Sequence, residues 1–352
     1  MNIQAKSVRL KHHKTGVEKE FLLRLFRPGD EEEVLKCVEE EYGDTYYRRE
    51  YYDRDLLLKQ TGSGKLLLFL ACCDGELCGI QSIISHSPGE TRLEAASQIF
   101  KKAYRGYGLP YELVKYTYEA AKSLKPSCIY ASTVIFHNIT QKMCEDAGMK
   151  AVAFNFGSHL TSGMHNSYSL GKSEKYGQAI LILPVAKQDA GNVYIHPEIE
   201  NPVKRLYREL GVNANIISRT SDALPPEGTG KTLLDLSINE REQSISIKVK
   251  KIGKDLMEVI KDIKDSHSKK YWTIQLILPV DEECALSAYE KLRKEGFFFT
   301  GLRPLCSSQE EIFMQYTGDV LFCFEEFSLT DEFKLLLNEI LERRKSALNP
   351  GL

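Results

Sequence analysis

Residues 101–110 read Lys-Lys-Ala-Tyr-Arg-Gly-Tyr-Gly-Leu-Pro, and they lie between an expected strand at 93–100 and an expected helix at 110–124. Gly106 and Gly108 let backbone N–H groups approach a ligand without a Cβ in the way. The start of the helix adds unpaired N–H groups and the positive end of the helix dipole, and the adjacent arginine adds a charge. The stretch therefore predicts a phosphate or pyrophosphate site, although a glycine turn before a helix is also common without a ligand.

The stretches on both sides of this loop predict a mixed α/β fold with a mostly antiparallel sheet flanked by helices. The turn Asp74-Gly75 between two apolar runs is a strong hairpin signal. Asp30, followed by Glu33 and by apolar residues at helical spacing, predicts the start of a helix. The expected order is a strand at 21–26, helices at 30–42 and 46–59, a hairpin at 66–73 and 77–85, the loop with its two flanking elements, a strand at 128–133, a short helix ending at Gly148 and a strand at 179–185.

This order of elements, together with the Arg-Gly-Tyr-Gly core of the loop, resembles the Gcn5-related N-acetyltransferase (GNAT) family. The coenzyme A loop of that family reads Gln/Arg-x-x-Gly-x-Gly/Ala, and Ala103 stands here at the leading position. The resemblance covers residues 18–188 and is closest to a bacterial subgroup with a Tyr-Gly-x-Thr-Tyr segment, here 42–46, and a His-x-x-Ser/Thr-Gln segment, here 137–141. It implies a GNAT fold and the transfer of an acetyl group from acetyl-CoA to an amine.

At 352 residues the chain is long enough for two domains. We expect a GNAT domain at 1–188 and a second, degenerate GNAT-like domain at 189–352, with the polar stretch 187–192 as the linker. The reason is that the order strand, loop, helix, glycine, strand occurs at 128–154 and again at 272–302.

The second half has no Arg/Lys-Gly-x-Gly loop before a helix. Its stretch 226–232 imitates the end of a P-loop, but Pro225 occupies the position of the required first glycine, so we expect a surface turn there. The expected elements are a helix at 201–210, strands at 232–238 and 244–249, a helix at 254–263, a strand at 272–278, a helix at 282–295, strands at 297–301 and 312–316, and a terminal helix that includes 333–341.

The resemblance also implies which residues would hold the coenzyme. They lie at the end of the strand before the loop, in the loop itself and after the next strand: Gln98, Ile99, Phe100, Arg105, Gly106, Tyr107, Gly108, Leu109 and Asn138. Simple burial in a strand is the alternative for the first three. Pro110 stands where the family usually keeps one further N–H donor.

Three residues are candidates for proton transfer. Glu94 stands where many family members keep a carboxylate that accepts the amine proton through water, and a solvated strand-end carboxylate is the alternative. Cys144 replaces the tyrosine that commonly protonates the leaving thiolate, with an inert packing thiol as the alternative. His137 is a second candidate acid, with a structural histidine as the alternative. The tyrosine-rich segment 46–52 is either a lid over the acceptor or a helix packed on the sheet.

Composition restricts the class of partner. The chain has 47 basic and 49 acidic residues and a net charge of −2, which argues against nucleic acid or an anionic membrane as a partner. No apolar run reaches the length of a membrane span, and the first residues lack the pattern of a signal peptide. Nine cysteines without a Cys-x-x-Cys pair favour reduced thiols over disulfides or a metal site. We expect a cytoplasmic protein without a metal, and the sequence leaves a homodimer open.

The resulting prediction is an acyl-CoA-dependent N-acetyltransferase in which a primary amine of a small molecule attacks acetyl-CoA directly. Two alternatives stay open. The altered positions Ala103, Pro110 and Cys144 are compatible with a non-catalytic acyl-CoA sensor or scaffold. Paired GNAT-like domains also occur in aminoacyl-tRNA-dependent transferases, a class in which a broad basic surface is expected.

Overall fold

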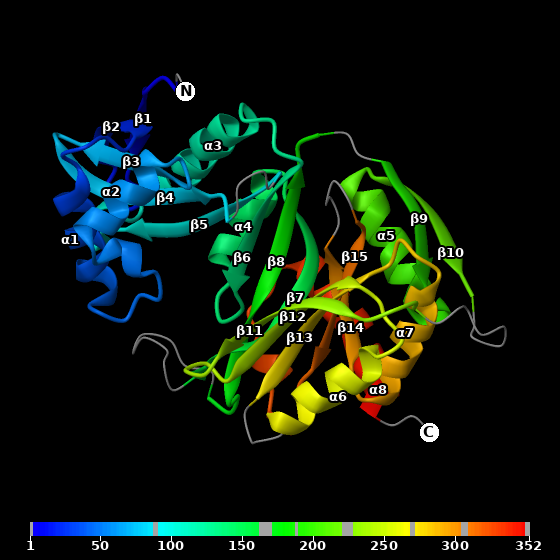
Figure 1. Cartoon of the computed structure of the whole chain (residues 1–352). Helices are drawn as coiled ribbons and strands as arrows, with labels where there is room; N and C mark the ends of the chain where they lie inside the picture. Colours follow the sequence, from blue (N-terminus) through cyan, green and yellow to red (C-terminus); the bar gives the residue numbers. More distant parts are fainter. Residues whose placement is uncertain are drawn as a thin grey trace. The chain divides into compact units, whose positions relative to one another are not determined.

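The computed structural model describes residues 3–86, 91–161, 171–186, 189–219, 228–267, 272–303 and 309–348. Its strands pair mostly antiparallel and are flanked by helices, which confirms the predicted α/β class (Figure 1). The chain divides into two compact units, residues 1–131 and residues 132–352. Each unit is described by itself below. The expected domain boundary at residue 188 stays a prediction.

The first unit contains six strands in the order β1-β2-β3-β4-β5-β6. Neighbouring strands are antiparallel except β5 and β6, which are parallel. Its elements are β1 (Lys6–Lys11), β2 (Glu18–Leu25), α1 (Glu31–Tyr42), a 3₁₀ turn (Arg49–Tyr51), α2 (Arg54–Gly62), β3 (Leu66–Cys73), β4 (Glu76–Ile84), β5 (Arg92–Phe100), a second 3₁₀ turn (Lys102–Tyr104), α3 (Leu109–Lys122) and β6 (Cys128–Val134), whose last three residues belong to the second unit.

Both faces of this sheet are covered by helices, as the alternation of side chains along β3 illustrates. Leu68 belongs to a buried cluster with Val34 of α1 and Leu57 of α2. The next residue, Phe69, points to the opposite face, where its ring lies 5.8 Å from that of Tyr116 in α3. The apolar residues of both faces of β3 are therefore buried.

Local signals predicted several elements of this unit correctly. The β3–β4 hairpin turns at Asp74 and Gly75, which have φ values of 51° and 85° as a primed turn requires. α1 begins after Asp30 as expected, but the Asp30 side chain makes no cap hydrogen bond and instead accepts from Arg24 at 2.6 Å. The expected helix at 46–59 is shorter, because α2 begins only at Arg54.

The second unit contains a sheet in the order β8-β7-β14-β15-β13-β12-β11 and a separate parallel pair, β9 and β10. Its elements are α4 (Ile139–Asp146), β7 (Lys150–Leu160), β8 (Lys175–Pro184), β9 (Asp189–Ile195), a 3₁₀ turn (Pro197–Ile199), α5 (Glu200–Leu210), β10 (Asn213–Ser218), β11 (Leu233–Asn239), β12 (Ser244–Lys251), α6 (Leu256–Ser266), β13 (Thr273–Pro279), α7 (Cys284–Lys294), β14 (Phe298–Arg303), β15 (Glu311–Tyr316), a 3₁₀ turn (Phe324–Glu326) and α8 (Asp331–Leu348).

The predicted linker at 187–192 is wrong over its described part. Residues 189–192 begin β9, while 187 and 188 lie outside the described residues. Asp189, Gly191 and Asn192 are exposed in this strand. Their polarity therefore reflects the exposed face of a two-stranded ribbon.

The predicted repeat of elements is present. β6-α4-β7 and β13-α7-β14 have the same order, and each turn into the last strand contains a left-handed glycine, Gly148 with φ 92° and Gly296 with φ 87°. Each of these two sets is preceded by a strand and a helix, β5-α3 and β12-α6. The preceding strand pairs in parallel with the first strand of its set, β5 with β6 and β12 with β13. The interpretation of the second set as a GNAT-like domain stays a prediction.

The two sets of the repeat meet in the second unit where β7 pairs with β14 through Ala153 and Gly301. A Cβ on Gly301 would lie 2.2 Å from the carbonyl oxygen of Val152, so only glycine allows the two strands to approach this closely. The stacked rings of Phe154 and Phe156, 5.1 Å apart, pack beside this junction.

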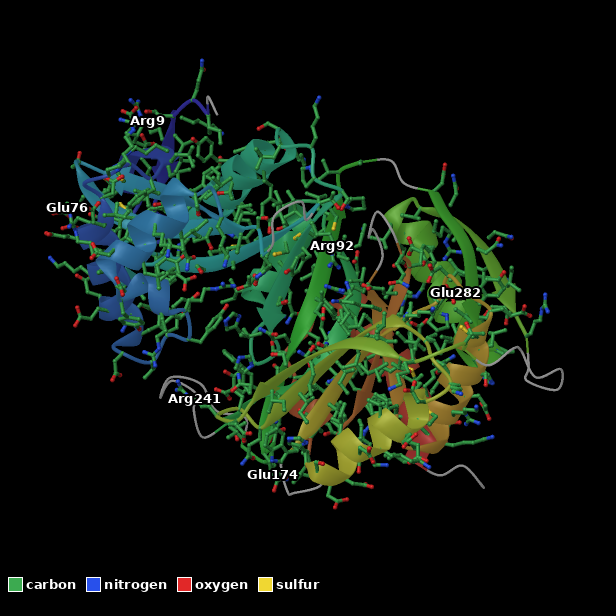
Figure 2. The ribbon with its side chains drawn as sticks, viewed as in Figure 1. Arg9, Glu76, Arg92, Glu174, Arg241 and Glu282 are labelled. Atoms are coloured by element: carbon green, nitrogen blue, oxygen red, sulfur yellow. The ribbon has the colours of Figure 1, made fainter. Side chains whose placement is uncertain are left out.

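A fully buried lysine connects three strands at one end of this sheet. Lys175 of β8 has no exposed surface, and its ammonium donates to the carbonyl oxygens of Glu242 and Gln243 at 2.8 and 2.9 Å and to Thr273 Oγ1 at 3.3 Å. Glu174, labelled in Figure 2, precedes it and accepts from the backbone N–H of Leu321 at 3.0 Å. Burial lowers the pKa of Lys175 to about 8, although the charge of Glu242 acts to raise it.

Lys175→Met should destabilise the protein by about 2–4 kcal/mol, because the change leaves buried carbonyl groups without their donor. The folded-state pKa of Lys175 lies below its ordinary value of 10.5, so the unfolded chain keeps the proton to higher pH and wild-type stability should rise between pH 8 and pH 10.5. Urea unfolding at several pH values measures both effects. Lys172→Met, at an exposed neighbour, is the control, and equal stability of the two variants would contradict the assignment.

Candidate functional site

The glycine loop between β5 and α3 has the backbone that the sequence predicted. Gly106 and Gly108 have φ values of 90° and 73°, a region that side chains disfavour, and a Cβ on Gly108 would point into open space. Among the described residues, no acceptor pairs with the backbone N–H groups of Gly106, Tyr107 and Gly108. Three consecutive unpaired donors at the start of α3 fit a phosphate or pyrophosphate group.

The side chains of the loop anchor it to the rest of the first unit. Tyr107 packs edge-on against Phe21 of β2, with ring centroids 5.3 Å apart, and Leu109 is fully buried. The hydroxyl of Tyr104 donates to the carboxylate of Glu76, which is labelled at the start of β4 in Figure 2, at 2.9 Å. The guanidinium of Arg105 forms an ion pair with Glu41 of α1. Glu41 therefore competes with a phosphate for the predicted contact of Arg105.

The end of β5 has one edge without a strand partner in the register. Its parallel pairing with β6 covers Arg92–Ala95 only, and Ala96, Ile99 and Phe100 pair with β4 alone. Ser97 lies in a bulge with φ 54°, which disrupts the ladder beside Gln98. The predicted coenzyme contacts Gln98, Ile99 and Phe100 therefore lie on a strand whose second edge offers backbone groups for an extended ligand.

Glu94 of β5 is the centre of an ion-pair network. Arg48 Nη2 donates to both of its carboxylate oxygens at 2.9 Å, and His86 Nε2 lies 2.6 Å from Oε2. Arg48 and Glu94 each expose only 12% of their side chains, whereas His86 exposes 46%. Arg48 also contacts Glu50 at 3.8 Å and lies 5.0 Å from the ring centre of Tyr47.

These partners decide the protonation state of Glu94. Burial acts to raise its pKa, but the hydrogen bond from His86 and the charge of Arg48 outweigh burial and hold the pKa below its ordinary value. Glu94 is therefore an ionised acceptor and a weak base. Since a carboxylate only accepts, Nε2 of His86 carries a proton, and Nδ1 is the ring nitrogen that can accept one in the neutral form.

The tyrosine-rich segment packs beside this network and forms no continuous helix. The hydroxyl of Tyr46 donates to Ser97 Oγ at 3.1 Å, which joins the segment to the bulge of β5. Burial raises the pKa of Tyr46 well above its usual value, so the hydroxyl stays protonated. The ring of Tyr47 is 57% exposed and covers the Arg48 guanidinium. The segment is therefore not the packed helix of the second alternative. It contains one short 3₁₀ turn, with Tyr51 buried and Tyr47 exposed.

The remaining predicted site residues lie in the second unit. His137 precedes α4, and burial lowers the pKa of its ring, which favours the neutral form. Asn138 is the N-cap residue of α4 but makes no side-chain cap hydrogen bond. Cys144 is 3% exposed on the packed face of the same helix. The first unit thus contains Glu94 near the start of β5, residues 98–100 at its end and residues 105–109 in the loop, and the second unit contains the other three.

The corresponding loop of the second half, between β12 and α6, is filled by the chain itself. Gly253 N donates to Thr232 Oγ1 at 3.1 Å, and Lys254 N donates to the carbonyl of Gly230 at 3.1 Å. A Cβ on Gly253 would lie 2.2 Å from Thr232 N, so this approach requires glycine. The described part of the P-loop-like stretch therefore occupies the donors that the first loop leaves unpaired.

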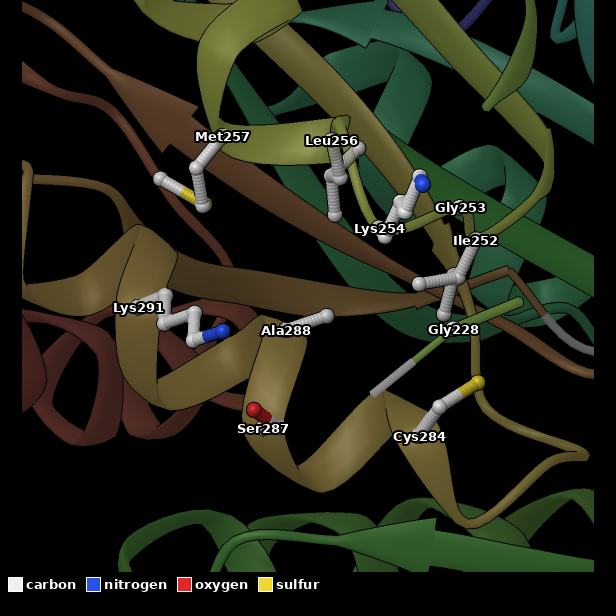
Figure 3. Close-up of a pocket in the computed structure, with 10 residues that line it drawn as sticks. All are labelled: Gly228, Ile252, Gly253, Lys254, Leu256, Met257, Cys284, Ser287, Ala288 and Lys291. Carbon is white, nitrogen blue, oxygen red and sulfur yellow. The ribbon is translucent and has the colours of Figure 1, made fainter. Parts of the chain in front are cut away.

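A small pocket lies beside this second loop (Figure 3). Lys254 from the loop and Lys291 from α7 line it together with mainly small or apolar side chains, and the thiol of Cys284 lies at its edge. Burial and the nearby Glu282 carboxylate raise the pKa of Cys284 to about 11, so this thiol is protonated at neutral pH.

Four residues of the first unit were missed as site residues by sequence reasoning. Arg48 and His86 contact Glu94, and His12 and His13 of the β1–β2 turn contact the glycine loop. Arg48 carried a signal, since an arginine next to a tyrosine can form a cation–π contact. The histidines carried none, because their partners are distant in sequence.

No helix in the described part of the chain is long and apolar enough to cross a membrane. Within the same ranges there is no group of three His, Cys, Asp or Glu side chains that could hold a metal ion.

No protein-family model and no curated protein matches this chain. Solved structures do. Its structural neighbours are GNAT-family acetyltransferases. One from Streptococcus pneumoniae is 14% identical, covers 47% of this chain and 99% of its own, and has a TM-score of 0.40. The Escherichia coli ribosomal-protein-S18-alanine N-acetyltransferase is 10% identical over 47% of this chain and 94% of its own, with a TM-score of 0.37. A chimera that includes Vibrio cholerae spermidine N-acetyltransferase is 14% identical over 47% and 95%, with a TM-score of 0.37.

Glu94→Gln should destabilise the protein by about 3 kcal/mol, because it leaves the charge of Arg48 buried without its partner. The double variant Arg48→Met/Glu94→Gln should lose less stability than the sum of the losses in Arg48→Met and in Glu94→Gln. Because the pKa of Glu94 is lowered, its contribution is present above pH 4.5 and is lost as the pH falls through the lowered value.

Urea unfolding at pH 7 and at lower pH measures these differences. Lys122→Met is the control, since its ion pair with Glu119 is exposed and should be worth less than about 1 kcal/mol. Additive losses in the double variant would contradict the coupling of Arg48 and Glu94.

Proposed function

We propose that this protein is an acyl-CoA-dependent N-acetyltransferase whose coenzyme binds to the glycine loop of the first unit. The observation that carries the proposal is the row of unpaired N–H groups at Gly106, Tyr107 and Gly108, directly before α3. The pantetheine arm would extend along the open edge of β5 at residues 98–100. When bound, acetyl-CoA supplies the thioester that the acceptor amine attacks.

The acceptor that this site suits best is a primary amine of a small molecule. Glu94 and Glu50 provide negative charge beside Tyr47, whose exposed ring offers a face to a cation. Glu94 orients His86, so that Nδ1 of His86 takes the proton that the amine must lose. The predicted roles of Asn138 in holding the coenzyme and of His137 or Cys144 as the acid stay predictions, and the burial of Cys144 is typical of a packing thiol.

The second half has a different role in this proposal. Gly230 and Thr232 accept the hydrogen bonds of its related loop, so this half would hold no coenzyme. It would stabilise the protein without taking part in the reaction. The proposal therefore gives one coenzyme per chain. The non-catalytic sensor stays a second candidate, and the observation that favours it is the ionised, fully paired state of Glu94.

Calorimetry should give one coenzyme A bound per chain, and Gly108→Asp should weaken binding by roughly tenfold to a hundredfold. The added carboxylate would lie where the phosphate is expected. Gly108 is a sharper test than Gly106, because a Cβ on Gly106 would also strike His12 Nε2 at 2.5 Å. Gly211→Asp is the matched control, since Gly211 is left-handed with φ 66° and open space around it. Two bound coenzymes, or equal affinity of both variants, would contradict the proposal.

His86→Gln should lower the rate of acetyl transfer to a panel of small primary amines by a factor on the order of 10²–10⁴, with coenzyme affinity unchanged. The glutamine keeps a donor for Glu94 but has no basic nitrogen. His267→Gln, at the end of α6, is the control. Coenzyme binding without transfer to any amine would favour the sensor, and full activity of His86→Gln would return the base to Glu94 and water.

A further inference from the structure

The turn between β1 and β2, residues 12–17, lies directly on the glycine loop. The backbone N–H of His13 donates to the carbonyl oxygen of Gly106 at 3.0 Å. The His13 ring nitrogen Nδ1 lies 2.8 Å from the same oxygen. A carbonyl oxygen only accepts, so Nδ1 must carry a proton, and one residue supplies both donors to this carbonyl.

The neighbouring His12 is held in the opposite tautomer. Its Nδ1 accepts from the backbone N–H groups of Lys14 and Thr15, both at 3.2 Å, so the proton of the neutral ring is on Nε2. That nitrogen lies over Gly106, 2.5 Å from where a Cβ would be. The two imidazoles stack with centroids 5.2 Å apart, and the ring of Tyr107 meets His12 edge-on at 5.0 Å.

The bond from His13 decides which way the loop donors point. In a trans peptide the C=O and the following N–H point in opposite directions. The carbonyl of Gly106 is directed toward His13, so the N–H of Tyr107 is directed away from the turn. This N–H is the middle one of the three donors that have no acceptor among the described residues.

We propose that His13 is a positioning residue of the coenzyme site, which holds the Gly106–Tyr107 peptide in its anion-binding orientation. The inference rests on the proposed function, since it assigns His13 to the site named there. His13 acts through the hydrogen bond from its Nδ1 to the carbonyl oxygen of Gly106. A direct contact between a charged imidazole and phosphate is the competing explanation, and the two differ in which substitutions restore binding.

Asparagine and glutamine separate these explanations. In His13→Asn the amide nitrogen takes the place of Nδ1 and can donate to Gly106, whereas His13→Gln moves the amide further out and His13→Ala removes the donor. His13→Lys keeps a positive charge without a donor at that position. Lys14→Ala is the control, because it removes a charge from the same turn and leaves the backbone bond of Lys14 to His12 in place.

The first readout uses the protein without coenzyme. Amide hydrogen exchange at residue 13, whose N–H donates to the Gly106 carbonyl, and at Tyr111, whose N–H donates to the Gly108 carbonyl, is compared with the intrinsic rate of each amide. It should be faster in His13→Ala, His13→Gln and His13→Lys, and unchanged in His13→Asn and Lys14→Ala. The second readout is coenzyme A affinity by calorimetry, which should fall by roughly threefold to tenfold in the first three variants, as expected for one neutral hydrogen bond.

Unchanged exchange and affinity in His13→Ala would overturn the proposal, and so would restoration by lysine but not by asparagine. If the wild-type protein binds no coenzyme A, the proposed function fails, while the exchange experiment still decides whether His13 holds the loop.

Discussion

A backbone N–H group that lacks an acceptor in a folded protein calls for a partner, and residues 106–108 present three such groups in a row. The related loop of the second half has the same place between a strand and a helix, but Thr232 Oγ1 and the carbonyl of Gly230 accept from it. Two versions of one structural unit thus satisfy one requirement by different means. In the first unit the acceptors must come from water or from a ligand, whereas in the second the chain supplies them.

The charge of Glu94 imposes a second constraint on the chemistry. A carboxylate that receives both bonds of an arginine and one from a histidine is held in its charged form. It is therefore poorly suited to remove a proton by itself. The hydrogen bond between His86 and Glu94 places a ring proton of His86 on Nε2, so Nδ1 is the nitrogen that can accept a proton. The side chain of His86 is nearly half exposed. In the proposed function, Glu94 therefore acts by orienting His86 and not by accepting the proton itself.

The sequence predicted those elements whose signals are local. The Asp74-Gly75 turn, the start of α3 at the glycine loop and the periodic helices of the second half depend on residues within a few positions of each other. The contacts around Glu94 and Gly106 could not be predicted from the sequence, because Arg48 and Glu94 are 46 residues apart and His13 and Gly106 are 93 residues apart. Neither distance leaves a period or a motif in the chain. The prediction of a linker at residues 189–192 fails because an exposed edge strand, here β9, and a loop have the same polar composition.

Left-handed glycines permit the loop conformation but cannot hold it, since glycine also loses the most conformational freedom on ordering. The order must therefore come from neighbours that are remote in sequence. Phe21 packs on Tyr107, Glu41 binds Arg105, and His13 directs the Gly106 carbonyl. A loop that is ordered before the ligand arrives loses less entropy on binding, and its affinity rises accordingly. These three contacts surround the loop and leave its N–H groups at residues 106–108 without an acceptor among the described residues.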